Sequence, residues 1–137
     1  MTDTIDVAAR LYTALRHTDL PALTDLLHPS FTGQISDGMP LNVGGPIAGP
    51  DQMLRGVWGV VATEFDAAPE PDEYVRVDDN RVIVLGYYRG RSRTTNRPYQ
   101  AAFAHDLTIA DGKITTLTQI TDTKPWHDAL TTETEPV

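Results

Sequence analysis

One stretch of this chain, from Tyr99 to Ala110, reads with a period of two and is followed at once by Asp111-Gly112. A period of two is typical of a β-strand with one buried face, and Asp-Gly between two such runs is a strong signal for a hairpin turn. Lys113 to Asp122 is then the returning strand. The first strand of this hairpin places a defined set of side chains on one face: Tyr99, Ala101, Phe103, His105, Leu107 and Ile109.

That face is apolar except for His105. Burying an imidazole among hydrocarbon side chains costs free energy unless the ring finds a hydrogen-bond partner. Histidine is also the side chain whose ordinary pKa lies nearest neutrality. Two interpretations follow: His105 lines a pocket as a titratable group, or it is a core histidine bonded to a neighbouring carbonyl or carboxylate.

The chain before this hairpin divides into a helical part and a strand part. Apolar residues recur at helical spacing in three segments, which predict helices over residues 4–17, 19–28 and 50–65. Residues 31–35, 73–77 and 81–91 are predicted to be strands, and 126–130 one helical turn. Loops are predicted where glycine, proline and acidic residues gather, over residues 42–50 and 66–72.

Helices followed by a run of antiparallel strands indicate the α+β class. We expect one strongly curved sheet that wraps three helices and leaves a cavity at its open end. With 137 residues the chain has the length of one domain, expected over residues 1–130. Residues 131–137 are expected to be a disordered acidic tail.

Composition and charge exclude several classes of protein. The chain has no cysteine, which excludes disulfides and thiolate chemistry, and it has no apolar run of about 18 residues, which excludes a membrane span. The formal net charge of −8 repels nucleic acid and anionic membrane surfaces. No pair of histidine or acidic residues shows metal-ligand spacing, so we expect no metal site. The acidic N-terminus has no signal pattern, and we expect a cytoplasmic protein.

The turn at Asp111-Gly112 leaves open which side chain lies beside His105. A two-residue turn pairs Ala110 with Lys113; His105 then faces Thr118, and the pocket side holds Thr118, Ile120 and Asp122. A three-residue loop makes His105 face Leu117 and puts Leu117 and Gln119 on the pocket side, and a bulge could switch between the two sets. Asp122 beside His105 would make an oriented acid–base group, whereas Gln119 is better suited to binding a carbonyl or hydroxyl.

The remaining candidate side chains are expected to contact a ligand rather than to react with it. Tyr12 and Trp58 lie on apolar helix faces and Phe103 on the hairpin face; Asp37 lies in a loop from which it could point inward. Tyr87, Tyr88 and Arg89 could reach the mouth of the cavity. The arginines of this region are otherwise expected to be the solvated end of a hairpin: Arg89, Arg91, Arg93 and Arg97.

Several segments together resemble a known family. Val43 to Gly49, Val84 to Gly90, Phe103-Ala104-His105, and Asp111 to Ile114 followed by Gln119 to Thr123 look like the SnoaL-like, ketosteroid-isomerase-related branch of the nuclear transport factor 2-like superfamily. The resemblance spans roughly Val7 to Leu130. It implies a cone-shaped α+β fold with three helices, a deep pocket for a small hydrophobic molecule, and a homodimer formed through the sheet.

The resemblance also implies a function. Members include isomerases, polyketide cyclases, dehydratases and small epoxide hydrolases, besides binding proteins without activity. The first hypothesis is an enzyme that needs no cofactor and moves a proton in an apolar, carbonyl-bearing substrate. His105 would be its acid–base group, Asp122 an orienting or second base, and Gln119 and Tyr87 donors to a developing oxyanion. The catalytic aspartate of the family's last strand aligns with Gln119, however, and a glutamine is no general base. The alternatives are a protein that only binds a hydrophobic ligand and an epoxide hydrolase.

Overall fold

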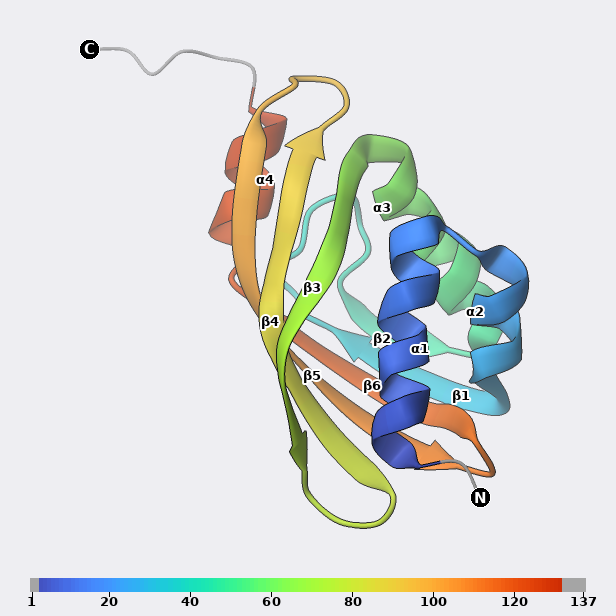
Figure 1. Ribbon diagram of the computed structural model, residues 1–137. Helices are drawn as coiled ribbons and strands as arrows, with labels where there is room; N and C mark the ends of the chain where they lie inside the picture. Colours follow the sequence, from blue (N-terminus) through green and yellow to red (C-terminus); the bar gives the residue numbers. More distant parts are fainter. Residues whose placement is uncertain (1–2, 132–137) are drawn as a thin grey trace.

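A computed structural model describes residues 3–131 as a curved six-stranded sheet with helices on its concave side (Figure 1). The strand order is β2-β1-β6-β5-β4-β3, with β1 parallel to β6 and every other pair antiparallel. The sheet does not close into a barrel. The predicted α+β class with a curved sheet around N-terminal helices is confirmed. The expected tail over residues 131–137 lies outside the described residues, apart from Thr131.

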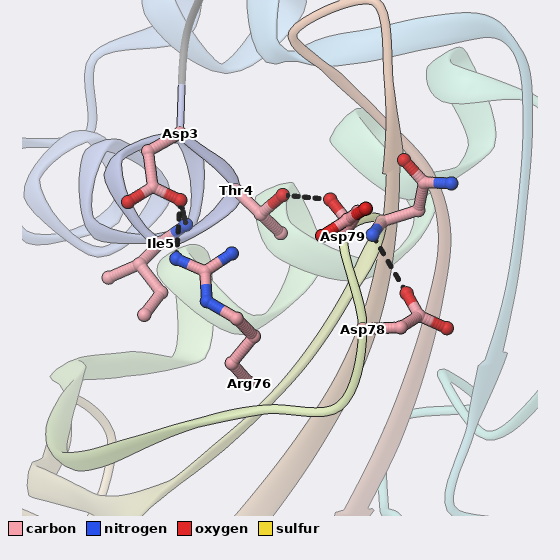
Figure 2. A network of polar contacts seen from close by, with 7 residues as sticks. Asp3, Thr4, Ile5, Arg76, Asp78 and Asp79 are labelled. Carbon is pink, nitrogen blue, oxygen red and sulfur yellow. Dashed lines mark hydrogen bonds and ion pairs between the residues drawn. The ribbon is translucent and has the colours of Figure 1, made fainter.

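The first two helices form as predicted because their ends are capped. Helix α1 spans Thr4–His17, and the Asp3 carboxylate accepts the Ile5 amide at its start. Figure 2 shows how that start is tied to the turn between β3 and β4. Arg76 pairs with Asp3 at 2.6 Å, and the Thr4 hydroxyl donates to the Asp79 carbonyl at 2.6 Å. Helix α2 spans Leu20–Leu26 with Asp19 as its cap. It ends two residues before the predicted end at His28 because β1 (Leu27–Ile35) begins at Leu27.

The third predicted helix contains an irregularity that faces the cavity. A π-helical turn, η1 (Gln52–Trp58), leads into α3 (Gly59–Glu64). The Gly59 amide donates to the Leu54 carbonyl, five residues back, and a Cβ on Gly59 would lie only 3.0 Å from that oxygen. A glycine at this position therefore permits the wider turn, which is a known mark of functional sites in helices.

Two segments predicted to be loops are strands, and pairing with distant residues is the reason. β2 (Gly45–Ala48) pairs with β1, so the prediction of a loop over 42–50 is wrong for these four residues. β3 (Phe65–Arg76) includes residues 66–72, also predicted as a loop. Its two prolines are tolerated because β3 is an edge strand with a partner on one side only. Gly86 and Gly90 of β4 (Arg81–Ser92) allow the close approach of β3, since a Cβ on either would lie 2.2 Å from a β3 carbonyl oxygen.

The central hairpin begins in the first of the two registers that the sequence left open and then departs from both. β5 (Pro98–Ala110) and β6 (Lys113–Thr121) are joined by the two-residue turn, with Asp111 and Gly112 both at positive φ and Ala110 paired with Lys113. One residue later the register shifts by a bulge, so His105 pairs with Gln119 and not with Thr118 or Leu117, the two partners that the sequence allowed. The pocket side therefore holds Leu117 and Gln119, while Ile120, expected inward in the first register, is 62% exposed.

The last helix of the described residues is α4 (Lys124–Leu130), which packs on β4 and β5. The buried indole of Trp126 donates from Nε1 to the Thr121 hydroxyl at 3.2 Å. It thereby closes one end of the concave face. Among residues 3–131, no helix has the length and apolar character needed to cross a membrane.

Candidate functional site

The concave face of the sheet and the helices enclose a cavity of about 150 Å³. Apolar side chains from α1, η1, α3 and the sheet make most of its wall; Leu11, Met53, Val57, Trp58, Phe65 and Leu117 are examples. Four further lining residues are polar and come from β4, β5 and β6: Tyr88, Tyr99, His105 and Gln119. The charged lining residues Arg16, Asp66 and Arg93 are exposed to solvent. In the part of the cavity wall that is protected from solvent, the polar side chains are therefore phenols and an amide, which carry no charge, and one imidazole.

His105 lies on β5 between two tyrosines and is 3% exposed. Its Nδ1 is 2.8 Å from the hydroxyl oxygen of Tyr12 on α1, and its Nε2 is 2.7 Å from that of Tyr88 on β4. The ring stacks on Phe103, with centroids 4.1 Å apart. Both ring nitrogens are thus engaged, and aromatic packing fixes the plane of the imidazole. His105 therefore lines the cavity and is at the same time a buried histidine with bonded nitrogens, so it shares features of both interpretations drawn from the sequence.

The proton on the imidazole is placed by the needs of the two hydroxyls. Within the described part of the chain, Nδ1 of His105 is the one hydrogen-bond partner of the buried Tyr12 hydroxyl. A ring proton on Nδ1 would leave the Tyr12 hydrogen without an acceptor, at a cost of about 1–3 kcal/mol. Tyr12 therefore donates to Nδ1, and the ring proton sits on Nε2, which donates to the Tyr88 oxygen.

The Tyr88 oxygen accepts a second hydrogen bond from Gln119, whose Nε2 is 3.1 Å away. The orientation of the Gln119 amide is fixed from the other side, because its Oε1 accepts the backbone N–H of Ser36 at 3.3 Å and an N–H can only donate. Two N–H groups fill the acceptor capacity of the Tyr88 oxygen. Its own hydrogen has no acceptor among residues 3–131, on a side chain that lines the cavity.

Burial sets the protonation of this cluster. It lowers the pKa of His105 to about 3, so the imidazole is neutral near pH 7. Burial also raises the pKa of the Tyr88 and Tyr12 phenols above their usual value, so both stay protonated. The site therefore works with neutral hydrogen-bond donors, and Tyr88 is the donor that it turns toward the cavity.

The structure brings only part of the predicted set together. Tyr12 and Phe103 contact His105 and support its ring, while Trp58 and Gln119 line the cavity. Asp122 does not pair with His105, so the prediction of a histidine–carboxylate pair is wrong. The reason is the bulge in β6, which pairs the Asp122 amide with the Ala102 carbonyl and leaves its side chain exposed.

Three further predicted contacts point away from the cavity. Tyr87 lies on the convex face with the Arg89 guanidinium 4.9 Å over its ring, and Arg89 bonds to Glu70 and Gln100 there. Asp37 is exposed. The prediction that these three residues line the pocket is wrong. For Tyr87 and Arg89 the reason is that side chains alternate between the two faces of a strand, and the inward tyrosine of β4 is Tyr88. The alternation of Val82, Val84, Gly86 and Tyr88 in the sequence carried that signal.

The described residues include no group of three histidine, cysteine or acidic side chains that could hold a metal ion. The protected wall also offers no positive charge to a phosphate or nucleotide, because His105 is neutral and the lining arginines are exposed to solvent. The arrangement is suited to a neutral or weakly acidic organic molecule that fits an apolar cavity and accepts a hydrogen bond from a phenol.

Comparison with known proteins places this geometry in a family. The profile of the SnoaL-like domain matches residues 8–117. No curated protein matches this chain. Among solved structures, a nuclear transport factor 2-like protein from Burkholderia thailandensis E264 is similar, with 25% identity, a TM-score of 0.85, and coverage of 96% of this chain and 99% of that chain.

Two other solved structures share the fold at lower identity. TerC, co-crystallised with polyporic acid, has 23% identity and a TM-score of 0.82, with 93% of this chain and 98% of that chain covered. IdmH from Streptomyces antibioticus, a candidate polyketide cyclase, has 22% identity and a TM-score of 0.81, with 94% and 99% covered. The match of the family profile over most of the chain confirms the resemblance seen in the sequence. The chain belongs to the SnoaL-like domain family, within the nuclear transport factor 2-like fold.

Proposed function

We propose that this protein is a small-molecule enzyme that promotes proton transfer in an apolar, carbonyl-bearing substrate, as isomerases, polyketide-type cyclases and dehydratases do. The observation that carries the proposal is the Tyr88 hydroxyl, which accepts two N–H hydrogen bonds and keeps its own hydrogen for the cavity. The similarity in fold to IdmH, a candidate polyketide cyclase, supports the same class of reaction.

The chemistry of the proposal starts from the substrate carbonyl. When a solvent water at the exposed part of the lining takes a proton from the carbon beside a carbonyl group, the electrons of the broken C–H bond form the enolate and negative charge develops on the carbonyl oxygen. A fixed donor in a water-poor cavity stabilises that charge more than the neutral ground state. The hydrogen bonds that Tyr88 receives from His105 and Gln119 polarise its hydroxyl in the same direction and strengthen its donation.

His105 takes a different role here from the acid–base group expected from the sequence. With its pKa lowered to about 3, the imidazole is a weak base, and both of its nitrogens already have partners. We assign it as a positioning residue that holds the Tyr88 hydroxyl and donates to its oxygen. Gln119 is the second positioning residue, anchored by the Ser36 amide.

A second function, binding without turnover, is favoured by one specific observation. Asp66 is the only carboxyl side chain among the described lining residues, and it is exposed. A protected wall of neutral donors can hold a ligand without providing a strong base. The co-crystal of TerC with polyporic acid supports a ligand site in this fold. The third hypothesis, an epoxide hydrolase, gains no support, because the amide of Gln119 occupies the position at which that chemistry needs a carboxylate.

Exchange of the α-hydrogens of 1-tetralone in D2O, followed by NMR, tests the proposal. The wild-type protein is expected to accelerate exchange over buffer, and Tyr88→Phe to lower the rate constant by about 10²–10³-fold, the loss typical of one oxyanion donor. Tyr87→Phe, on the convex face, is the matched control and should exchange like the wild type. Saturable binding of 1-tetralone without accelerated exchange would assign the protein to the binding class.

The partner expected from the resemblance, a second copy of this chain, stays a proposal. It is supported by apolar side chains on the convex face of the sheet, where Ile120 is 62% and Leu85 is 39% exposed. Sedimentation of the wild-type chain over a range of concentrations tests it, and a monomer at all concentrations would contradict it.

A further inference from the structure

The Tyr99 hydroxyl is the one buried side-chain polar atom in the described part of the chain that has no hydrogen-bond partner. Its side chain is 9% exposed and lines the same cavity as Tyr88. A buried hydroxyl without a partner costs about 1–3 kcal/mol, and buried tyrosine hydroxyls are otherwise bonded. A phenylalanine would fill the same space without that penalty. The hydroxyl therefore points to a hydrogen-bond partner that the described part of the protein does not provide.

The ring of Tyr99 is held in place by its neighbours. Its centroid lies 5.1 Å from that of Phe65 and 4.9 Å from that of Trp126. The polar group of Trp126 cannot serve Tyr99, because its N–H already donates to Thr121. On the opposite strand Tyr99 pairs with Gly90, which has no side chain to offer. The hydroxyl thus belongs to a ring that is held in place, and the described residues around it offer it no partner.

Tyr99 and Tyr88 belong to one aromatic wall, since the Trp126 ring centroid lies 4.9 Å from that of each tyrosine. Burial and the nearby Tyr88 phenol raise the pKa of Tyr99, so its hydroxyl remains a donor. Tyr88 also turns a hydrogen toward the cavity, as derived above. Two tyrosine side chains that line the cavity therefore each keep a hydroxyl hydrogen without an acceptor among residues 3–131. A ligand with two acceptor oxygens can bond both.

We propose that Tyr99 is a specificity-determining residue that hydrogen-bonds a second oxygen of the ligand, so that this cavity selects apolar compounds with two carbonyl-type oxygens over compounds with one. The inference rests on the proposed function, in which Tyr88 holds the first oxygen. It narrows the substrate class from carbonyl compounds in general to diones, quinones and their enol forms.

A matched pair of bicyclic probes tests this selectivity: 1,4-naphthoquinone, with two carbonyl oxygens, and 1-tetralone, with one. The chain has no cysteine to which a quinone would add. Binding is followed by the fluorescence of Trp58 and Trp126, both of which line the cavity. Tyr99→Phe is expected to weaken binding of the quinone about three- to tenfold and to leave binding of 1-tetralone unchanged, since one neutral hydrogen bond is lost.

The variants separate a failure of this inference from a failure of the proposed function. Tyr88→Phe should weaken binding of both probes, because both use the first oxygen. An unchanged ratio of affinities in Tyr99→Phe, with both probes still sensitive to Tyr88→Phe, overturns the role of Tyr99 alone. Probes that are insensitive to Tyr88→Phe overturn the proposed function. No saturable binding of the quinone up to about 1 mM overturns the selectivity as well.

Thermal unfolding without ligand gives a second, independent readout. Because Tyr99→Phe removes an unpaired buried hydroxyl and keeps the ring, the apo variant is expected to unfold at the same temperature as the wild type or a higher one. A lower unfolding temperature would mean that the hydroxyl has a partner inside the protein, and would overturn the proposal.

Discussion

The two faces of the sheet differ in the polar groups that they carry and in how these groups are paired. His105 and Asp106 are neighbours on β5, yet His105 is buried on the concave face while Asp106 forms a bidentate ion pair with Arg81 on the convex face. The concave face connects its polar groups by neutral hydrogen bonds, from Tyr12 through His105 and Tyr88 to Gln119, and leaves the Tyr99 hydroxyl without a partner among residues 3–131. The convex face uses charges that water screens.

The difference follows from the cost of desolvation. A buried charge is costly unless it is paired and fully bonded, whereas a neutral hydrogen-bonded group is tolerated in an apolar wall. The concave face can therefore hold donors ready for a ligand without charged side chains in its protected part. On the convex face, substitution of a charged side chain costs little free energy, and that face contributes little to the site. The largest effect is expected when His105, the centre of the hydrogen-bond network on the concave face, is replaced.

His105→Leu keeps an apolar volume on the concave face but removes the partner of the Tyr12 hydroxyl and one of the two donors to the Tyr88 hydroxyl, which keeps Gln119. We expect a loss of unfolding free energy of about 1–3 kcal/mol from the Tyr12 hydroxyl left unpaired, measured by urea denaturation. Adding Tyr12→Phe to this variant should recover stability, although Tyr12→Phe alone should destabilise the wild type. Additive effects of the two substitutions would contradict a direct bond between the two side chains.

The same histidine makes the concave face sensitive to acid. Burial holds the pKa of His105 at about 3 in the folded state, against an ordinary value of 6.5 that applies when the chain unfolds. Between these values the unfolded chain binds the extra proton, so stability is complete above pH 6.5 and falls as the pH decreases toward 3, by about 1.4 kcal/mol per pH unit from this group. The measurement is the difference in urea stability between wild type and His105→Leu across that range. A difference that does not change with pH would show that the ring takes up its proton in the folded state.

The smallest effect is expected on the convex face. Asp106→Asn breaks the ion pair with Arg81, whose two side chains are 45% and 31% exposed. We expect a loss of only about 0.2–1 kcal/mol, which shrinks further in high salt, and no change in ligand binding. Urea denaturation at low and high salt measures it. A loss as large as that of His105→Leu would remove the distinction between the two faces.

The sequence was sufficient where local signals decide the structure. Helix α1, the Asp19 cap of α2, the turn at Asp111-Gly112 and the inward side of β5 follow from periodicity, capping and turn chemistry, which act within a few residues. The place of His105 on the apolar face of its strand follows from the same alternation. So does the family, since its segments recur in this order along the chain.

Tertiary structure alone decided what lies opposite His105. A single bulge in β6 shifted the register, so that Gln119 lies opposite His105 in place of Thr118 or Leu117 and Asp122 leaves the pocket side; no local pattern marks that bulge. β2 and the first half of β3 exist because they pair with strands distant in the sequence, which overrides their glycines and prolines. The partners Tyr12 and Tyr88 come from α1 and β4, 93 and 17 residues away from His105. Register and long-range pairing depend on the packing of the whole sheet, so the protonation of the site and its free donors could be read only from the folded chain.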